Sequence, residues 1–263
     1  MSVDDVVTRL RAAGCVFAED EAAVLSESAA SVDELAAMVE QRAGGLPLEH
    51  IVGWAEFCGR RILVGPGVFV PRRRSEFLVR CAVRYAAPGA VVVDLCCGTG
   101  AVGAAVAAVV EGIELHASDF DPAAVAWARA NLPDAAVYEG DLDAALPADL
   151  RRRVDLIVAV APYVPTDAVR LMPPEARDHE RRLALDGGED GLDVVRRLAG
   201  LAPSWLVRGG RLLVEVGDHQ AEATASAFTR AGLDAHRERN DEADATVVVG
   251  RHRPDGTGVT MRP

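Results

Sequence analysis

Lysine is missing from the sequence: all 28 of its basic residues are arginine, and 40 acidic residues outnumber them. The formal net charge is -12 at pH 7, whereas proteins dedicated to nucleic acid usually carry a basic surface, so a nucleic-acid partner is not expected. We interpret the absence of lysine, together with the abundance of alanine and valine, as the coding bias of a GC-rich genome. The arginine clusters at 72–74 and 151–153 are therefore predicted to be solvated surface.

Long hydrophobic runs are missing as well. No uninterrupted apolar stretch reaches the ~18 residues needed to cross a bilayer, and the first residues, MSVDD, lack the basic start of a signal peptide. The five cysteines show neither Cys-x-x-Cys nor Cys/His ligand spacing, and the histidines share no metal spacing. This pattern favours reduced thiols over disulfides or zinc. The sequence therefore predicts a cytoplasmic protein without a membrane span or a metal site.

What the sequence does contain is an alternation of strands and helices after residue 90. Strands are expected at 90–95, 113–118, 135–139, 154–159 and 211–216, and helices at 101–110, 121–132, 192–201 and 220–231. Repeated βα units imply right-handed crossovers and a mainly parallel sheet. The last two expected strands, near 233–239 and 245–250, have no helix between them and should form an antiparallel hairpin.

The chain divides into four predicted regions. Residues 1–45 form a short helical region, in which Ser31-Val-Asp-Glu34 has the pattern of a capping box. Residues 46–74 are a linker with extended or hairpin segments, broken by glycine and proline. Residues 75–251 form the large α/β domain, and residues 252–263 are expected to be a frayed tail.

The first strand of the large domain leads into a glycine-rich loop, DLCCGTGAVG, from Asp94 to Gly103. Its G-x-G-x-x-G pattern, with Asp119 about 20 residues beyond, also fits a dinucleotide-binding fingerprint. The position of Asp94 favours S-adenosylmethionine instead, because a carboxylate there suits the ammonium group of a methionyl moiety. A pyrophosphate would need bare amide donors at a helix N-terminus.

Acidic residues follow three successive strands: Asp94, Asp119 and Asp141. Asp119 is expected to accept both ribose hydroxyls, and Asp141 to meet an adenine amino group. The alternative interpretation is that these are capping and turn residues. The complete predicted cofactor site consists of Asp94, Cys96, Gly98, Thr99, Gly100, Asp119, Phe120, Asp141 and Leu142.

The fourth strand ends in Val160-Ala161-Pro162-Tyr163, a loop expected at the carboxyl edge of the sheet beside the cofactor. A Pro-Tyr pair offers a rigid backbone carbonyl and an aromatic face, which together can hold a planar amide or amine. Methyl transfer from a sulfonium proceeds by in-line attack, so the protein mainly aligns the nucleophile and excludes water. The loop is therefore predicted to hold the methyl acceptor.

An ordered series of motifs extends from about Gly45 to Gly250. In sequence letters these are GLPLEHIVG, EF, VGPGVFVPR, SE, DLCCGTGAVG, MPPEARDHE, ALDGGEDGLDVVRRL and LLVEVGDHQ. Each motif alone is generic, but in this order they resemble the HemK/PrmC family of release-factor protein-(glutamine) methyltransferases. The family signature at the acceptor loop is Asn-Pro-Pro-Tyr.

The resemblance implies a Rossmann-like, seven-stranded S-adenosylmethionine-dependent methyltransferase fold with a short N-terminal helical cap. It implies methylation of the GGQ glutamine amide of a peptide-chain release factor, with S-adenosyl-L-homocysteine as product. The implied catalytic residues are Val160, Ala161, Pro162 and Tyr163. The implied substrate-binding residues are Phe69, Pro71, Arg72, Pro162 and Tyr163.

This chain departs from the family at Val160, where asparagine is expected to bind the glutamine amide. Valine has no donor or acceptor, and one lost buried contact costs about 1–3 kcal/mol, or one to two decades in rate. The Ala161 carbonyl survives as an acceptor. Weakened activity, a non-catalytic binder, and methylation of a small amino acid or natural-product amine remain alternatives. The region before Gly45 is also shorter than in the family, which affects docking of a whole release factor.

Other polar residues have two interpretations each. Glu175, Asp178 and Glu180 are either a rim of the acceptor pocket or a charged helical turn. Arg181, which replaces the family's usual proline, is considered a minor change. Glu215, at the end of the fifth strand, is as consistent with a structural role as with a catalytic one.

Overall fold

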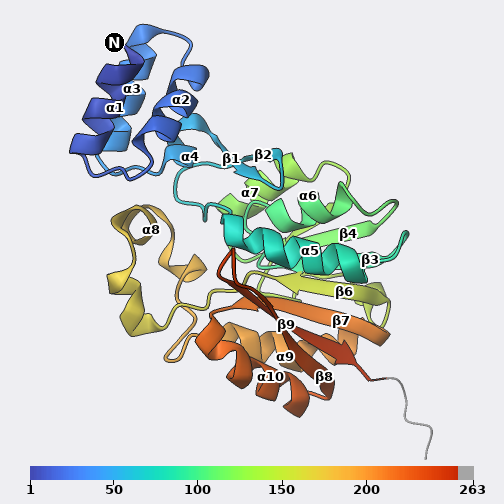
Figure 1. Ribbon diagram of the computed structural model, residues 1–263. Helices are drawn as coiled ribbons and strands as arrows, with labels where there is room; N and C mark the ends of the chain where they lie inside the picture. The colour runs from blue at the N-terminus through green and yellow to red at the C-terminus, as the bar shows by residue number, and fades with distance from the viewer. Residues whose placement is uncertain (254–263) are drawn as a thin grey trace, which may run out of the picture.

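A seven-stranded sheet forms the centre of the computed structural model, which describes residues 1–253 (Figure 1). Its strand order is β5-β4-β3-β6-β7-β9-β8. The strands are β3 (Val91–Leu95), β4 (Glu114–Asp119), β5 (Ala136–Glu139), β6 (Val154–Ala159), β7 (Leu206–Val216), β8 (Leu233–Asn240) and β9 (Ala245–His252). Strands β3 to β7 are parallel, whereas β9 pairs antiparallel with β7 and β8. The mainly parallel sheet and its terminal hairpin are confirmed.

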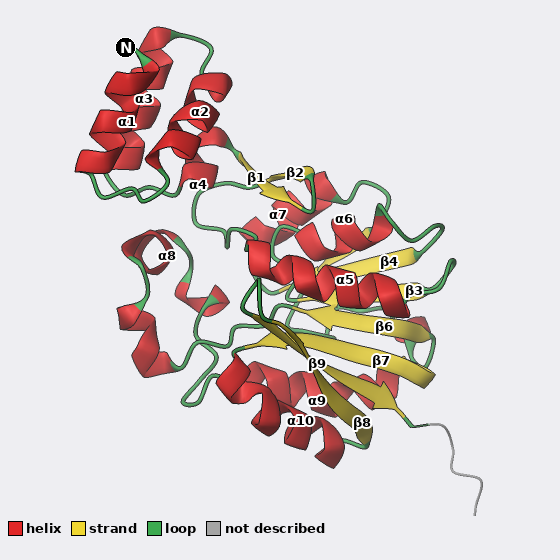
Figure 2. Ribbon diagram, viewed as in Figure 1, coloured by secondary structure: helices red, strands yellow, loops and turns green. Residues whose placement is uncertain are grey.

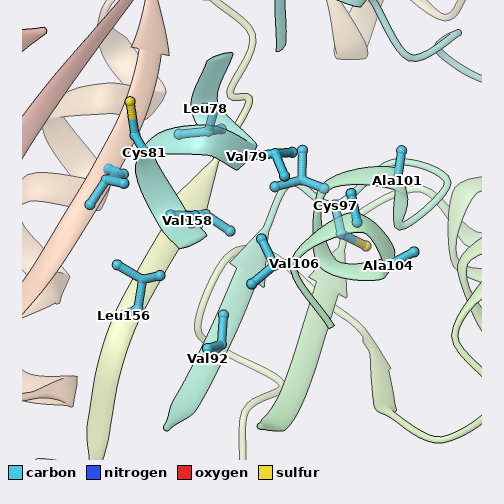
Figure 3. Packing of buried hydrophobic residues seen from close by; sticks show 14 of the residues in the cluster. Leu78, Val79, Cys81, Val92, Cys97, Ala101, Ala104, Val106, Leu156 and Val158 are labelled. Atoms are coloured by element: carbon cyan, nitrogen blue, oxygen red, sulfur yellow. The ribbon is translucent and has the colours of Figure 1, made fainter. Parts of the chain in front are cut away.

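Helices cover both faces of this sheet (Figure 2). One face carries α5 (Glu76–Tyr85), α6 (Ala101–Ala107) and α7 (Pro122–Asn131), and the other carries α9 (Asp193–Trp205) and α10 (Ala221–Arg230). Because side chains alternate along a strand, Val92 and Val158 pack toward α5, while Val93 and Ile157 pack toward α9. Figure 3 shows the first of these layers, in which Val158 lies near Leu78 of α5 and Val92 lies nearer to Val106 of α6.

Four N-terminal helices stand apart from the sheet (Figure 1). They are α1 (Val3–Ala12), α2 (Ala18–Ser28), α3 (Val32–Ala43) and α4 (Leu48–Val52). The first three enclose a small core of their own, which includes Leu10, Leu25 and Val39. The capping box predicted at the start of α3 is half formed. The Ser31 hydroxyl accepts the Glu34 amide at 3.1 Å, but the Glu34 carboxylate accepts the Ala30 amide instead of the Ser31 amide.

A two-stranded hairpin, β1 (Trp54–Phe57) and β2 (Arg60–Leu63), connects these helices to the large domain. Its turn residues, Cys58 and Gly59, both have positive φ angles, of 51° and 68°. Two left-handed residues give the turn a twist that matches the flanking strands, which makes the hairpin tight. After it, the chain passes the carboxyl edge of the sheet before α5 begins.

Several expected boundaries differ from the structure: β7 begins at Leu206 instead of residue 211, and α6 ends at Ala107 instead of residue 110. Helix α9 continues past residue 201 to Trp205, although Pro203 lies inside it. Tertiary contacts outweigh the proline here, because Trp205 is buried and its Nε1 donates to Asp143 Oδ2 at 2.8 Å. The predicted tail begins inside β9, where the buried His252 bonds the Leu206 carbonyl at 3.2 Å. Residues 254–263 of that tail lie outside the described residues.

No helix formed by residues 1–253 combines the length and the apolar character that a membrane span requires. Within the same residues, no group of three or more His, Cys, Asp or Glu side chains is arranged to hold a metal ion.

Candidate functional site

A pocket of about 370 Å³ opens at the carboxyl edge of the parallel strands, where the strand order reverses between β3 and β6. Most of the predicted site residues line it: Phe69, Arg72, Cys96, Gly98, Asp119, Phe120, Asp141, Leu142, Val160, Ala161, Pro162 and Tyr163. A second pocket of about 40 Å³ shares several of these residues and adds Pro71, Asp94 and Thr99. Gly100 lines neither pocket.

The glycine-rich loop is tied to the end of β4 by Asp119. One carboxylate oxygen of Asp119 accepts the Gly98 amide at 2.8 Å, and the other accepts the Asp121 amide at 2.9 Å. Gly100 has a structural role, since its φ is +77° and an added Cβ would lie 2.7 Å from Leu132 Cδ1. The loop therefore holds its shape through backbone bonds and close packing, and the carboxylate of Asp119 keeps unused lone pairs at the pocket wall.

The small pocket contains buried polar groups with unused hydrogen-bonding capacity, among them Asp94 and Thr99. Asp94 accepts the Gly103 amide at 2.9 Å through one oxygen. Burial raises the pKa of Asp94 to about 7, and the charge of Asp119 adds to this while the Gly103 amide opposes it. The buried Thr99 hydroxyl has no hydrogen-bond partner among residues 1–253. Such groups are normally satisfied, so this pocket suits a small polar ligand group.

The wall of the large pocket that follows β4 and β5 combines an exposed aromatic ring with a strained backbone. Phe120 is 58% exposed, which is unusual for phenylalanine and leaves its face open to the pocket. Leu142 has a φ of +54°, and its carbonyl accepts the Ser118 hydroxyl at 2.9 Å. Strained non-glycine residues of this kind concentrate at functional sites. Asp141 pairs with Arg197 of α9 at 2.8 Å, a partner that the sequence did not indicate.

The acceptor loop is held from behind by the ALDGGEDG motif, for which the sequence suggested no role. The Val164 carbonyl accepts the Gly187 amide at 2.8 Å. An added Cβ at Gly187 would lie 2.6 Å from the Pro162 carbonyl oxygen, and one at Gly191 only 2.2 Å from the Tyr163 carbonyl oxygen. Only glycine permits this close approach of two backbone segments.

Val160 lies between the two pockets and lines both of them. It is partly buried and packs against the core cluster beneath α5. The next residue, Ala161, is buried, and its carbonyl accepts no hydrogen bond from any residue of 1–253. The site therefore presents an apolar side chain where the family has asparagine, next to a backbone acceptor with free lone pairs.

The prediction that the cluster at 72–74 is solvated surface is incomplete for two of its members, although Arg74 is 45% exposed. Arg72 and Arg74 both line the large pocket, and Arg72 donates to both oxygens of the buried Glu180, at 2.6 and 2.7 Å. Burial raises the pKa of Glu180, while Arg72 lowers it. The exposed cluster at 151–153 matches its prediction. The partner of Arg72 lies more than a hundred residues away, so local pattern could not reveal it.

Arg181 also has a contact that the sequence did not indicate. Its guanidinium lines the large pocket and pairs with Asp121, the N-cap of α7, at 2.9 Å. Of the three acids considered as a rim, Glu180 is buried against Arg72, and Asp178 pairs with the adjacent Arg177 on the surface. The ion pair of Arg181 thus joins the cofactor side of the pocket to the segment after α8 (Pro174–His179).

Similarity to known proteins agrees with this geometry. A family model described as the methyltransferase small domain matches residues 60–172. A release factor glutamine methyltransferase from Geobacter sulfurreducens is 37% identical over 227 residues, which cover 83% of this chain and 79% of the relative. The chain belongs to the release factor glutamine methyltransferase family. The resemblance derived from the ordered motifs is therefore confirmed.

Two further comparisons describe the range of this family and its fold. A 4-amino-L-phenylalanine/4-methylamino-L-phenylalanine methyltransferase from Streptomyces pristinaespiralis is 35% identical over 207 residues, covering 75% of this chain and 70% of the relative. A methyltransferase structure from Pyrococcus furiosus shares the fold with a TM-score of 0.56, at 15% identity, over 74% of this chain and 90% of that chain. The Rossmann-like methyltransferase fold is confirmed.

Proposed function

We propose that this chain is an S-adenosylmethionine-dependent N-methyltransferase that methylates the glutamine side-chain amide of a peptide-chain release factor. The observation that carries the proposal is the shared pocket, in which strand-end carboxylates and the Pro162-Tyr163 loop face the same space of about 370 Å³. The family relationship supports glutamine as the acceptor. Such a partner would place the chain in the cytoplasm, in keeping with its five free cysteines.

The residues of the two pockets fit S-adenosylmethionine. Asp94 and the unpartnered Thr99 hydroxyl would hold the polar end of the methionyl group. Asp119 would accept the ribose hydroxyls through its remaining lone pairs, and the exposed ring of Phe120 would stack on the adenine. When bound, this cofactor supplies a methyl group on a positively charged sulfur.

The chain's own contribution to transfer is alignment. The acceptor nitrogen would use its lone pair to form the new C–N bond, the bound cofactor would leave with the electrons of the C–S bond on its sulfur, and the nitrogen would then release a proton to water. The free Ala161 carbonyl would accept an N–H of the acceptor, while the ring of Tyr163 would fix the plane of the amide. Holding the reactants in line provides most of the acceleration for such a reaction.

A second candidate function follows from Val160. Without an asparagine at this position, the site lacks the side chain expected to bind a glutamine amide, and its wall is more apolar. A relative with 35% identity is named for an amino acid that carries an aromatic amine. The pocket volume also suits a small ligand. Methylation of an aromatic amino-acid amine is therefore the alternative.

The test is a single-turnover transfer of labelled methyl from S-adenosylmethionine to a purified release factor, with a variant factor lacking the GGQ glutamine as control. Transfer to the intact factor alone supports the proposal. Transfer to 4-aminophenylalanine without transfer to the factor would support the second candidate. If the chain does not bind S-adenosylmethionine in calorimetry, both are wrong.

A further inference from the structure

A buried carboxylate lies behind the acceptor loop without a role in the proposed chemistry. Glu215, near the end of β7, is 2% exposed. Its Oε1 lies 3.2 Å from the Nε of Arg74. Burial raises the pKa of Glu215, while Ser75 and Arg74 lower it, and its carboxylate has no further polar partner within residues 1–253. A buried charge is costly unless it is paired, so this carboxylate holds Arg74 in one place.

The same guanidinium group of Arg74 also contacts the acceptor loop. Its guanidinium carbon lies 5.2 Å from the centre of the Tyr163 ring, and the residue lines the large pocket. A guanidinium at this distance is attracted to the face of the ring. Arginine side chains are normally flexible, and Arg74 is 45% exposed, but the ion pair with Glu215 restrains it at its Nε while its guanidinium carbon lies over the Tyr163 ring. Glu215, Arg74 and Tyr163 thus form a continuous series of contacts.

The charges around the pocket are divided between its two sides. The acids that line it are Asp119, at the end of β4, and Asp121 and Asp141, which follow β4 and β5, all on the cofactor side. On the acceptor side, the lining residues within 1–253 include arginines but no acid and no histidine. Arg72 and Arg74 are each paired with a buried acid that does not line the pocket. A reacting nitrogen in its ammonium form would therefore meet guanidinium groups and would find no lining carboxylate to pair with it or remove its proton.

We propose that Arg74, held by Glu215, is both a positioning residue for the Tyr163 ring and a specificity determinant that selects an uncharged acceptor nitrogen. Amides and aromatic amines are uncharged at neutral pH, whereas a lysine-type amine is protonated. The inference rests on the proposed N-methyl transfer and deepens it, because it covers the two acceptors considered above and excludes alkyl ammonium groups.

Two variants separate the two roles. Arg74→Met removes the charge but keeps an unbranched side chain, and Glu215→Gln releases Arg74 without removing its charge. Arg73→Met is the matched control, since Arg73 is exposed and lines neither pocket. The three variants are compared in methyl transfer to two acceptors. One is the release factor or 4-aminophenylalanine, whichever the unaltered chain methylates faster, and the other is a lysine-type amine. Cofactor affinity is measured separately.

Both Arg74→Met and Glu215→Gln should lower kcat/KM for the neutral acceptor by about 3- to 30-fold, the range of one cation–π contact. Their affinity for S-adenosylmethionine should stay unchanged. Only Arg74→Met should raise relative transfer to the lysine-type amine, because Glu215→Gln retains the positive charge. If Arg74→Met equals Arg73→Met in both assays, the inference is wrong.

A spectroscopic measurement tests the positioning role even if no acceptor is methylated. The chain has three tyrosines, so ¹³C-tyrosine labelling gives a small set of ring signals, and Tyr163→Phe assigns the relevant one. Arg74→Met and Glu215→Gln should both shift the Tyr163 signal, whereas Arg73→Met should not. Unchanged Tyr163 signals would overturn the positioning role. Absent transfer by the unaltered chain with intact cofactor binding would instead count against the proposed function.

Discussion

The buried side chain of Gln220 donates a hydrogen bond from its Nε2 to the Tyr163 carbonyl oxygen at 2.9 Å. The same nitrogen donates to the Asp190 carbonyl at 3.1 Å, and the Gln220 Oε1 accepts the Gly217 amide at 3.0 Å. One amide side chain therefore connects the acceptor loop to the segment before α9 and to the end of β7. Because a buried amide is costly to leave unpaired, the backbone of Tyr163 is fixed by residues far away in the sequence.

Gly191 lies in the same contact, which leads to a prediction for Gly191→Ala. The new Cβ would lie 2.2 Å from the Tyr163 carbonyl oxygen, and the φ of +77° disfavours alanine as well. The acceptor loop must move, and a displacement of about 1 Å costs on the order of 100-fold in rate. Single-turnover transfer should fall by that factor, while S-adenosylmethionine affinity should remain.

Gly200→Ala is the matched control for this experiment. An added Cβ at Gly200 meets no atom within 4 Å, and the residue lies inside α9, where alanine is favoured by up to about 1 kcal/mol. Its transfer rate should equal that of the unaltered chain. Equal rates for Gly191→Ala and Gly200→Ala would show that close packing behind Tyr163 does not position the acceptor.

Val160→Asn should increase transfer to a release factor. The side chain lies between the two pockets, and asparagine there would supply the missing partner for a glutamine amide. A buried contact of about 1–3 kcal/mol corresponds to a gain of roughly 10- to 100-fold. Val160→Leu, which adds no donor or acceptor, is the control. The two variants are compared in single-turnover assays, and an equal effect of both would mean that glutamine is not the acceptor.

The sequence predicted the sheet and the wall of the pocket because both follow local rules. Alternating strands and helices predict that β3 to β7 are parallel, and the glycine loop and the Pro162-Tyr163 loop must then lie at the same carboxyl edge. The supporting contacts could not be predicted in this way. Arg72 and Glu180, or Gln220 and Tyr163, come together only through the fold, and their partners are separated by 57 residues or more.

The pH dependence of cofactor binding should follow Asp94. Burial raises the pKa of this carboxyl to about 7, well above its ordinary value. The protonated carboxyl of Asp94 therefore stabilises the fold of the cofactor-free protein at acidic pH. This stabilisation is lost as the pH rises through about 7. A cationic methionyl group requires the ionised form, so affinity for S-adenosylmethionine should fall by about 15-fold between pH 7, where the carboxyl is half ionised, and pH 5.5.

Calorimetry across this range tests the pH prediction, together with urea unfolding of the cofactor-free protein. Asp94→Asn should remove the loss of stability between about pH 4 and pH 7, since asparagine does not titrate. A cofactor affinity that stays constant from pH 5.5 to pH 7 would contradict the assignment of Asp94 to the methionyl group.

Arg42 joins the N-terminal helices to the segment that carries the rim of the pocket, and its replacement should be strongly destabilising. The side chain is 6% exposed, pairs with Glu21 of α2 at 2.6 Å and also reaches Glu175 of α8 at 2.6 Å. Arg42→Ala would leave the carboxylate of Glu21 buried without its partner. Breaking a buried ion pair from one side costs about 3–5 kcal/mol, which urea unfolding would measure.

Arg9→Ala provides the comparison, because Arg9 forms a pair with Glu40 on the same helical unit but is 51% exposed. Exposed pairs contribute only about 0–1 kcal/mol, since water and salt screen both charges. The burial of the side chain, not the number of its ion pairs, therefore predicts the difference in unfolding free energy between the Arg42 and Arg9 variants. If both variants unfold at the same urea concentration, then Arg42 does not stabilise the fold, and its contact with Glu175 cannot anchor α8 beside the pocket.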